Sequence, residues 1–285
     1  MSPTALAVLL AAAILHASWN LLVKQATEKY AFTWWALLAG AVLFSPILLW
    51  SEPVPARVWP YLLASALCEA AYFAALITAY RLADFSLVYP LARGSAPALM
   101  AVGAIVWLRE DLRSWGVLGL SLLILGLLLV GSSARQGGGV SKGRSSAGLF
   151  AALAVAVLIA LYTLIDGAAV RFVPPALYNA LVFLATALFV TPLILLRYDR
   201  RALVAELRSH WPRILTVGIL NVLSYALVLY AYTRAPVGYA GAVREVSIVF
   251  AALAGWRWLG EPLGRLRLAG AVMIFAGILL IAVAG

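Results

Sequence analysis

Apolar residues run along this chain in long blocks that are separated by short polar segments. A helix needs about 20 mostly apolar residues to cross a bilayer, and ten blocks of roughly that length are present. They predict helices over 4–24, 32–50, 60–81, 86–108, 113–132, 147–169, 176–196, 212–233, 238–258 and 264–284. The pattern therefore predicts an all-α integral membrane protein with ten transmembrane helices.

The longest polar stretch, residues 135–146 (RQGGGVSKGRSS), falls between the fifth and sixth predicted helices. Its glycines and serines are typical of a flexible linker. We expect it to join a first five-helix repeat over 1–134 to a second one over 147–285. Because five is odd, two tandem copies must lie in the membrane in opposite orientations, so the halves are predicted to be inverted repeats.

Residues 79–131 and 231–282 carry recognisably the same segment twice. Equivalent pairs include Arg93/Arg244, Trp107/Trp258, Glu110/Glu261, Gly119/Gly270 and Gly126/Gly277. Small residues on one face let two helices approach closely in lipid. The repeated glycines therefore predict that the fifth and tenth helices pack together as a scaffold rather than line a pathway.

Composition supports a membrane protein, because 65% of the 285 residues are hydrophobic and only 11% are charged, against about a quarter charged in soluble domains. The net charge of +10 comes mostly from basic residues that flank apolar blocks, so we expect no nucleic-acid partner. These residues concentrate in loops after odd-numbered helices, which predicts that those loops are cytoplasmic and both termini are outside. The single Cys68 excludes a metal site built on cysteine.

Polar side chains within the predicted helices mark the candidate site, since such groups must face a protein interior or a water-filled cavity. The predicted substrate-binding residues are His16, Trp19, Asn20, Tyr80, Tyr89, Arg93, Tyr162, Asn221, Tyr225, Tyr232 and Arg244. The acids Glu69, Asp166 and Glu245 are candidates for ion pairing or for proton coupling.

Arg93 and Arg244 occupy equivalent places in the two copies. The prolines and glycine of YPLARGSAP predict a kink or local unwinding around Arg93. Two guanidinium groups near the middle of the membrane can receive a carboxylate or another anionic group. The alternative is that they only close structural ion pairs with Glu69, Asp166 or Glu245.

The chain contains no GxSxG, HExxH or GxxxxGKS motif, so an enzyme is not expected. We also expect no cofactor and no metal. Any pumping must use a gradient, because no segment resembles an ATP-binding domain.

Two copies of one pattern, WLREDLRSWGVLGLSLLILGLLLVG and WLGEPLGRLRLAGAVMIFAGILLIA, each read Trp-Leu-x-Glu followed by a glycine-marked apolar helix. With these segments and HASWNLLVK in the first helix, the chain resembles the drug/metabolite transporter superfamily, EamA branch, over nearly its whole length. The resemblance implies a basket of helices one, three, four, six, eight and nine around a cavity. It also implies similarity to bacterial exporters of amino acids, including aromatic ones.

Our hypothesis is a multi-pass inner-membrane transporter that exports amino acids, including aromatic and neutral ones, and related small metabolites. It would work by alternating access, as a monomer in the lipid bilayer. A cavity with aromatic walls suits amphipathic organic solutes better than bare ions. The first alternative is a multidrug exporter of lipophilic cations, in which a carboxylate rather than an arginine dominates the cavity. A lipid-modifying enzyme and a non-transporting scaffold are further alternatives.

Overall fold

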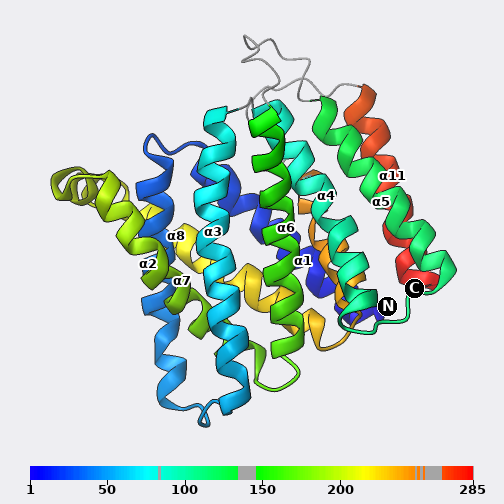
Figure 1. Ribbon diagram of the computed structural model, residues 1–285, viewed down its shortest axis with the longest axis horizontal. Helices are drawn as coiled ribbons and strands as arrows, with labels where there is room; N and C mark the ends of the chain where they lie inside the picture. Colours follow the sequence, from blue (N-terminus) through cyan, green and yellow to red (C-terminus); the bar gives the residue numbers. More distant parts are fainter. Residues whose placement is uncertain (83–84, 134–145, 248, 251–252, 254–264, 285) are drawn as a thin grey trace.

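The computed structural model of the protein describes residues 1–82, 85–133, 146–247, 249–250, 253 and 265–284. This part of the chain is helical, and no strand occurs in it (Figure 1). The elements are α1 (Pro3–Lys24), α2 (Lys29–Phe44), η1 (Ser45–Leu49), η2 (Ala56–Val58), α3 (Trp59–Leu82), α4 (Phe85–Val106), α5 (Ser114–Ser133), α6 (Ser146–Ala169), α7 (Pro175–Arg197), α8 (Arg200–Tyr232), α9 (Val237–Arg244) and α11 (Arg265–Ala284).

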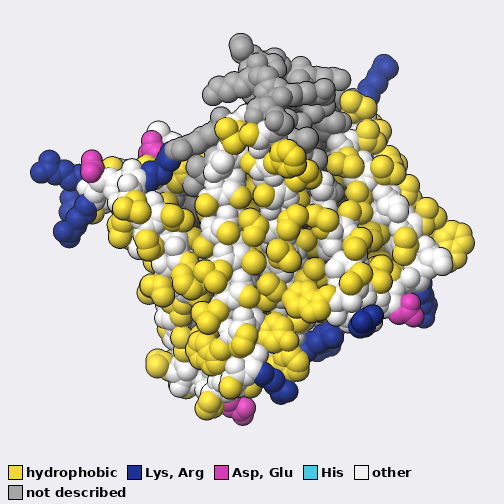
Figure 2. Space-filling view, viewed as in Figure 1, with side chains coloured by type: hydrophobic (Ala, Val, Ile, Leu, Met, Phe, Trp, Pro, Cys, Tyr) yellow, Lys and Arg dark blue, Asp and Glu magenta, His cyan; other side chains and the backbone are white. Residues whose placement is uncertain are grey.

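Within the described ranges, six helical segments are long and apolar enough to cross a membrane. They are Pro3–Val23, Lys29–Leu49, Ala56–Leu76, Phe150–Ala169, Pro175–Arg197 and Arg200–Tyr232. Apolar side chains cover most of the face over α3, α4 and α6 (Figure 2), as lipid contact requires. The all-α membrane class is therefore confirmed, while the count of ten helices and the inverted repeat stay predictions.

Two helices differ clearly from their predicted bounds. The eighth begins at Arg200, well before the predicted start at 212. Its first turns bury Leu203 and expose the arginines around it, so an amphipathic segment escaped a search for wholly apolar blocks. The ninth was predicted to run from 238 to 258 without interruption, but α9 ends at Arg244, where the backbone N–H of Glu245 bonds to the carbonyl of Ala242. Helical backbone resumes at Ser247, and residues 251–252 and 254–258 lie outside the described residues.

The local unwinding expected around Arg93 is absent, because α4 is helical from Phe85 to Val106. The interruption instead falls at the equivalent arginine of the second half. The backbone N–H groups of Glu245 and Val246 each bond to the carbonyl three residues earlier, which forms a tight turn directly after Arg244. The structure thus places a backbone turn beside the second copy of the repeated arginine, without a proline there.

Helices α5 and α11 lie side by side along their lengths (Figure 1). A Cβ atom on Gly119 would lie 2.7 Å from the carbonyl oxygen of Gly277, and one on Gly126 would lie 2.6 Å from that of Gly270. Backbone therefore touches backbone, and only glycine fits these positions. Residue numbers rise along one helix as they fall along the other, so the two run antiparallel. The predicted packing of this pair is confirmed.

The other helices position the site around α6. Helix α6 packs against α3 and α4, α9 lies against α4, and α1 lies against α8 and α9. Side chains from these elements are therefore brought to a common region, although they come from distant parts of the sequence.

Candidate functional site

Glu245 joins two arginines at the point where α9 ends. Its Oε2 lies 3.4 Å from Nε of Arg93, and its Oε1 lies 3.1 Å from Nη2 of Arg244. The side chains of Glu245 and Arg244 are 1% and 5% exposed, whereas Arg93 retains 13%. Two guanidinium groups thus share one buried carboxylate, and the planar donor forks of these groups can also receive the carboxylate of a ligand.

His16 completes this group from α1. Its Nε2 lies 2.9 Å from Nη2 of Arg93. A guanidinium group only donates, so Nε2 accepts, and the hydrogen-bond pattern assigns the ring as neutral with its proton on Nδ1. The ring meets Trp19 edge to face at 4.8 Å between centroids, and Asn20 Nδ2 donates to the carbonyl of His16 at 2.7 Å. These three predicted residues therefore lie together on α1.

Helix α6 connects the arginines to a buried acid. Nη2 of Arg244 lies 3.5 Å from the hydroxyl oxygen of Thr163. One turn further along α6, Asp166 is fully buried. Tyr178 donates to its Oδ1 at 2.8 Å, and Tyr225 donates to its Oδ2. Each carboxylate oxygen of Asp166 therefore has a hydroxyl partner.

Glu69 is held in a similar way, because the hydroxyl of Thr186 donates to its Oε2 at 2.7 Å. In the described part of the chain, the arginines pair with Glu245, while Glu69 and Asp166 accept from hydroxyl groups. Of the three acids that we named as ion-pair candidates, Glu245 is thus the one that pairs with the arginines among these residues.

Aromatic rings link these groups across four helices. Tyr72 of α3 lies 6.4 Å from Tyr162 of α6, and Tyr162 lies 6.4 Å from Tyr225 of α8, with interplanar angles of 71° and 65°. Phe183 of α7 lies 6.3 Å from Tyr225. The edge-to-face geometry of the two tyrosine pairs is favourable for aromatic rings. Tyr225 therefore belongs both to this aromatic chain and to the partners of Asp166.

Four predicted substrate-binding residues remain: Asn221, Tyr232, Tyr80 and Tyr89. Asn221 is half-buried on α8, one turn before Tyr225. Tyr232 is 5% exposed and belongs to the hydrophobic core near the end of α8. The side chains of Tyr80 and Tyr89 lie outside the described residues.

Three site residues were missed by sequence reasoning: Thr163, Tyr178 and Thr186. Thr163 stands beside Tyr162, one turn before Asp166, so its position on the helix was an available signal. Tyr178 and Thr186 lie on α7 and are 0% and 1% exposed. The basket implied by the family resemblance does not include α7, whose interior carries no acid or base.

Comparison with known proteins gives a consistent picture. The model of the EamA-like transporter family matches residues 3–132 and 146–283. The chain is 26% identical over 276 residues to the uncharacterized transporter YwfM of Bacillus subtilis (strain 168), which covers 92% of this chain and 87% of that protein. It is 29% identical over 119 residues to the uncharacterized transporter YvbV of the same organism, covering 41% and 38%. One crystal structure shares the fold with a TM-score of 0.81 at 19% identity, over 100% of both chains.

Proposed function

The chain belongs to the EamA-like transporter family and is therefore a multi-pass membrane transporter, and from this premise we propose that it exports amino acids and related small metabolites. The proposed substrates include neutral and aromatic amino acids, and the proposed location is the inner membrane of the cell. We propose that the protein works as a monomer by alternating access between inverted halves. The antiparallel contact of α5 and α11 at matching glycines supports this arrangement.

The observation that carries the proposal is the group formed by Arg93, Arg244 and Glu245. Its two guanidinium groups share one carboxylate, so the carboxylate of a substrate can replace that of Glu245 as the acidic partner of one arginine. Arg93 is the more exposed arginine and is the proposed first contact. An arginine offers a planar fork of donors that fits a carboxylate.

The opposite charge of an amino acid finds partners on the same helix. Thr163, which contacts Arg244, and Asp166 are three residues apart on α6. At 1.5 Å per residue this separates the two contact points by about 4.5 Å along the helix axis. The ammonium and carboxylate of an α-amino acid are similarly close. Asp166 is thus the proposed acceptor of the ammonium group, and Tyr162 and Tyr225 are the proposed contacts of an apolar side chain.

Export of lipophilic cations is the second candidate function. The observation that favours it is that Asp166 and Glu69 are bonded to hydroxyl groups rather than to arginines in the described contacts. An acid beside the aromatic chain of Tyr162 and Tyr225 can attract an aromatic cation. If the substrates are lipophilic cations, Asp166 or Glu69, and not Arg93, determines the affinity for the substrate.

Reconstitution in liposomes tests the proposal. The purified protein is assayed for movement of a panel of radiolabelled amino acids and of lipophilic cations, with and without a pH gradient. We expect protein-dependent movement of neutral and aromatic amino acids. The absence of movement for every amino acid, with movement of a lipophilic cation, establishes the second candidate instead.

A further inference from the structure

The first turns of α8 form a basic surface that the transport site does not use. Five arginines fall within residues 197–213. They are Arg197, Arg200, Arg201, Arg208 and Arg213. This part of α8 extends sideways from the bundle (Figure 1), and dark blue side chains gather on the extension (Figure 2). Of the two acids in the range, Asp199 is exposed, whereas Glu206 is buried and lies 3.0 Å from His210.

The opposite face of the same turns is fixed to the bundle. Leu203 and Ile214 are 3% and 2% exposed, and Nε1 of Trp35 on α2 donates to the carbonyl of Leu203 at 2.9 Å. The helix therefore cannot rotate freely about its axis. Its exposed face, which carries Arg200 and Arg208, keeps a set direction.

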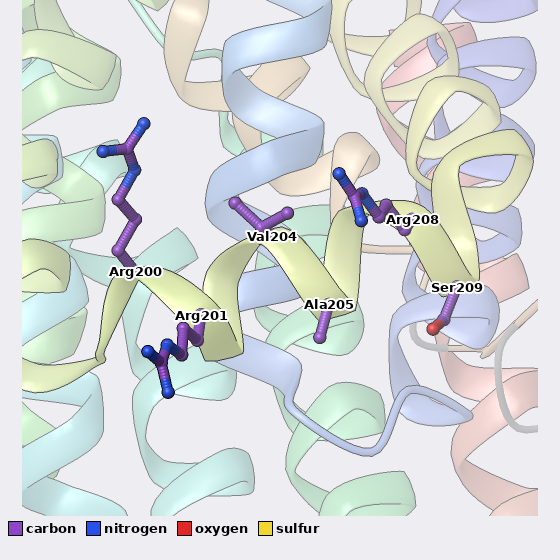
Figure 3. A pocket seen from close by; sticks show the side chains of 6 residues that line it. All are labelled: Arg200, Arg201, Val204, Ala205, Arg208 and Ser209. Carbon is purple, nitrogen blue, oxygen red and sulfur yellow. The ribbon is translucent and has the colours of Figure 1, made fainter.

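Three of these arginines line an open hollow of about 640 Å³ on the surface of α8 (Figure 3). Its lining consists of Arg200, Arg201, Val204, Ala205, Arg208 and Ser209. Figure 3 shows Arg200 and Arg208 extending to one side of the helix with Val204 between them, while Arg201 extends elsewhere. Ala205 and Ser209 lie on the same side of the helix as Arg201.

The hollow lies where the apolar surface of the protein ends. Leu195 and Leu196, in the last turn of α7, are 58% and 87% exposed, and Arg197 follows them directly. Trp211 is 58% exposed at the far end of the basic turns. Exposed apolar side chains face lipid tails, and basic residues with tryptophan mark the level of the headgroups.

We propose that this hollow binds the headgroup of an anionic phospholipid. Arg200 and Arg208, which extend to the same side of α8, contact the phosphate, which suits the donor fork of arginine, and Arg201 adds positive charge beside it. Leu196 and Trp211 contact the acyl chains of the same lipid. These apolar neighbours indicate a lipid rather than a free phosphate ion as the occupant.

The test measures lipid preference in the full-length protein. The protein is placed in phosphatidylcholine bilayers with a small fraction of spin-labelled phosphatidylglycerol or spin-labelled phosphatidylcholine, and the immobilised fraction of each is recorded. A triple variant R200Q/R201Q/R208Q is compared with R57Q/R109Q/R234Q. The second variant removes the same charge from exposed arginines at the loops before α3, after α4 and after α8.

We expect the preference for phosphatidylglycerol to fall at least threefold in the α8 variant and to stay unchanged in the control variant. An unchanged preference in the α8 variant, or an equal loss in both, overturns the proposal. Titration with inorganic phosphate in a neutral detergent is the second arm. Saturable phosphate binding that depends on the same arginines, without a lipid preference, shows a free-anion site instead. Circular dichroism checks that each variant is folded. If the triple α8 variant does not fold, the single change Arg208→Gln replaces it and is expected to weaken the preference for phosphatidylglycerol about twofold.

Discussion

Glu110 and Val237, which come from opposite halves of the sequence, are joined by a hydrogen bond of 2.7 Å from the backbone N–H of Val237 to Oε1 of Glu110. The N–H of Gly238 donates to Oε2 at 3.1 Å. The first amides of a helix lack partners within the helix, and the helix dipole favours a carboxylate there. Arg109, with φ of 56°, reverses the chain after α4 and directs Glu110 to the start of α9. Glu110 thus links the loop after α4 in the first half of the sequence to the start of α9 in the second half.

Replacement of Glu110 by glutamine tests this tie. Glutamine retains one acceptor oxygen and lacks the charge, so we expect the free energy of unfolding to fall by about 1 kcal/mol. Thermal unfolding of the purified protein in detergent measures the change as a lower Tm. The exposed Glu52 supplies the matched control, Glu52→Gln, whose Tm should equal that of the wild type. Equal melting of all three proteins contradicts a stabilising role for Glu110.

Arg93 is expected to determine affinity for the carboxylate of a substrate. In Arg93→Gln, Glu245 keeps Arg244 as its partner, but the guanidinium group that contacts Glu245 and His16 is lost. We expect KM for a neutral amino acid to rise at least tenfold, and Arg93→Lys to give an intermediate value because it retains the charge without the fork. Initial rates in proteoliposomes provide the measurement. Arg234→Gln, at an exposed position after α8, serves as the control, and an Arg93→Gln protein with wild-type KM refutes this role.

Asp166 separates the two candidate functions. Asp166→Asn removes the negative charge but keeps a carbonyl oxygen that can accept from Tyr178 or Tyr225. If amino acids are the substrates, transport of an amino acid should fall at least tenfold, while an analogue without the amino group should be affected less. Tyr178→Phe removes one hydrogen-bond donor to Asp166 without changing the charge, so it is the control for disrupted packing. Equal losses for both substrates argue against an ammonium contact.

The helices were largely predictable because apolar blocks of bilayer length leave few alternatives, as the bounds of α3 and α7 show. The start of α8 was not predictable from apolar blocks, since the exposed Arg201 and the buried Leu203 on opposite faces of one helix average to a polar segment. Neither was the end of α9 at Arg244. That turn depends on local hydrogen bonds of Glu245 that no pattern of hydrophobicity reports.

The charged members of the site were predictable for a different reason. Arg93, Arg244 and Asp166 stand out because charge is costly at membrane depth. Thr163 and Thr186 could not be recognised in this way, since the hydroxyl of a threonine in a helix can donate its hydrogen bond to a carbonyl of the preceding turn. Which acid meets the arginines also depends on packing between α4 and α9, and so it required the structure.

The glycine contact of α5 and α11 gives the last prediction. In Gly119→Ala the new Cβ would lie 2.7 Å from the carbonyl oxygen of Gly277 and 2.8 Å from Cβ of Leu280, so the helices must move apart. We expect a loss of about 1–3 kcal/mol, which is typical of overpacking. Thermal unfolding measures it, with Ser121→Ala at an exposed position of α5 as the control. If these helices are a scaffold and do not line the pathway, the folded fraction of Gly119→Ala should transport with an unchanged KM. A raised KM at unchanged stability would instead place this pair in the transport pathway.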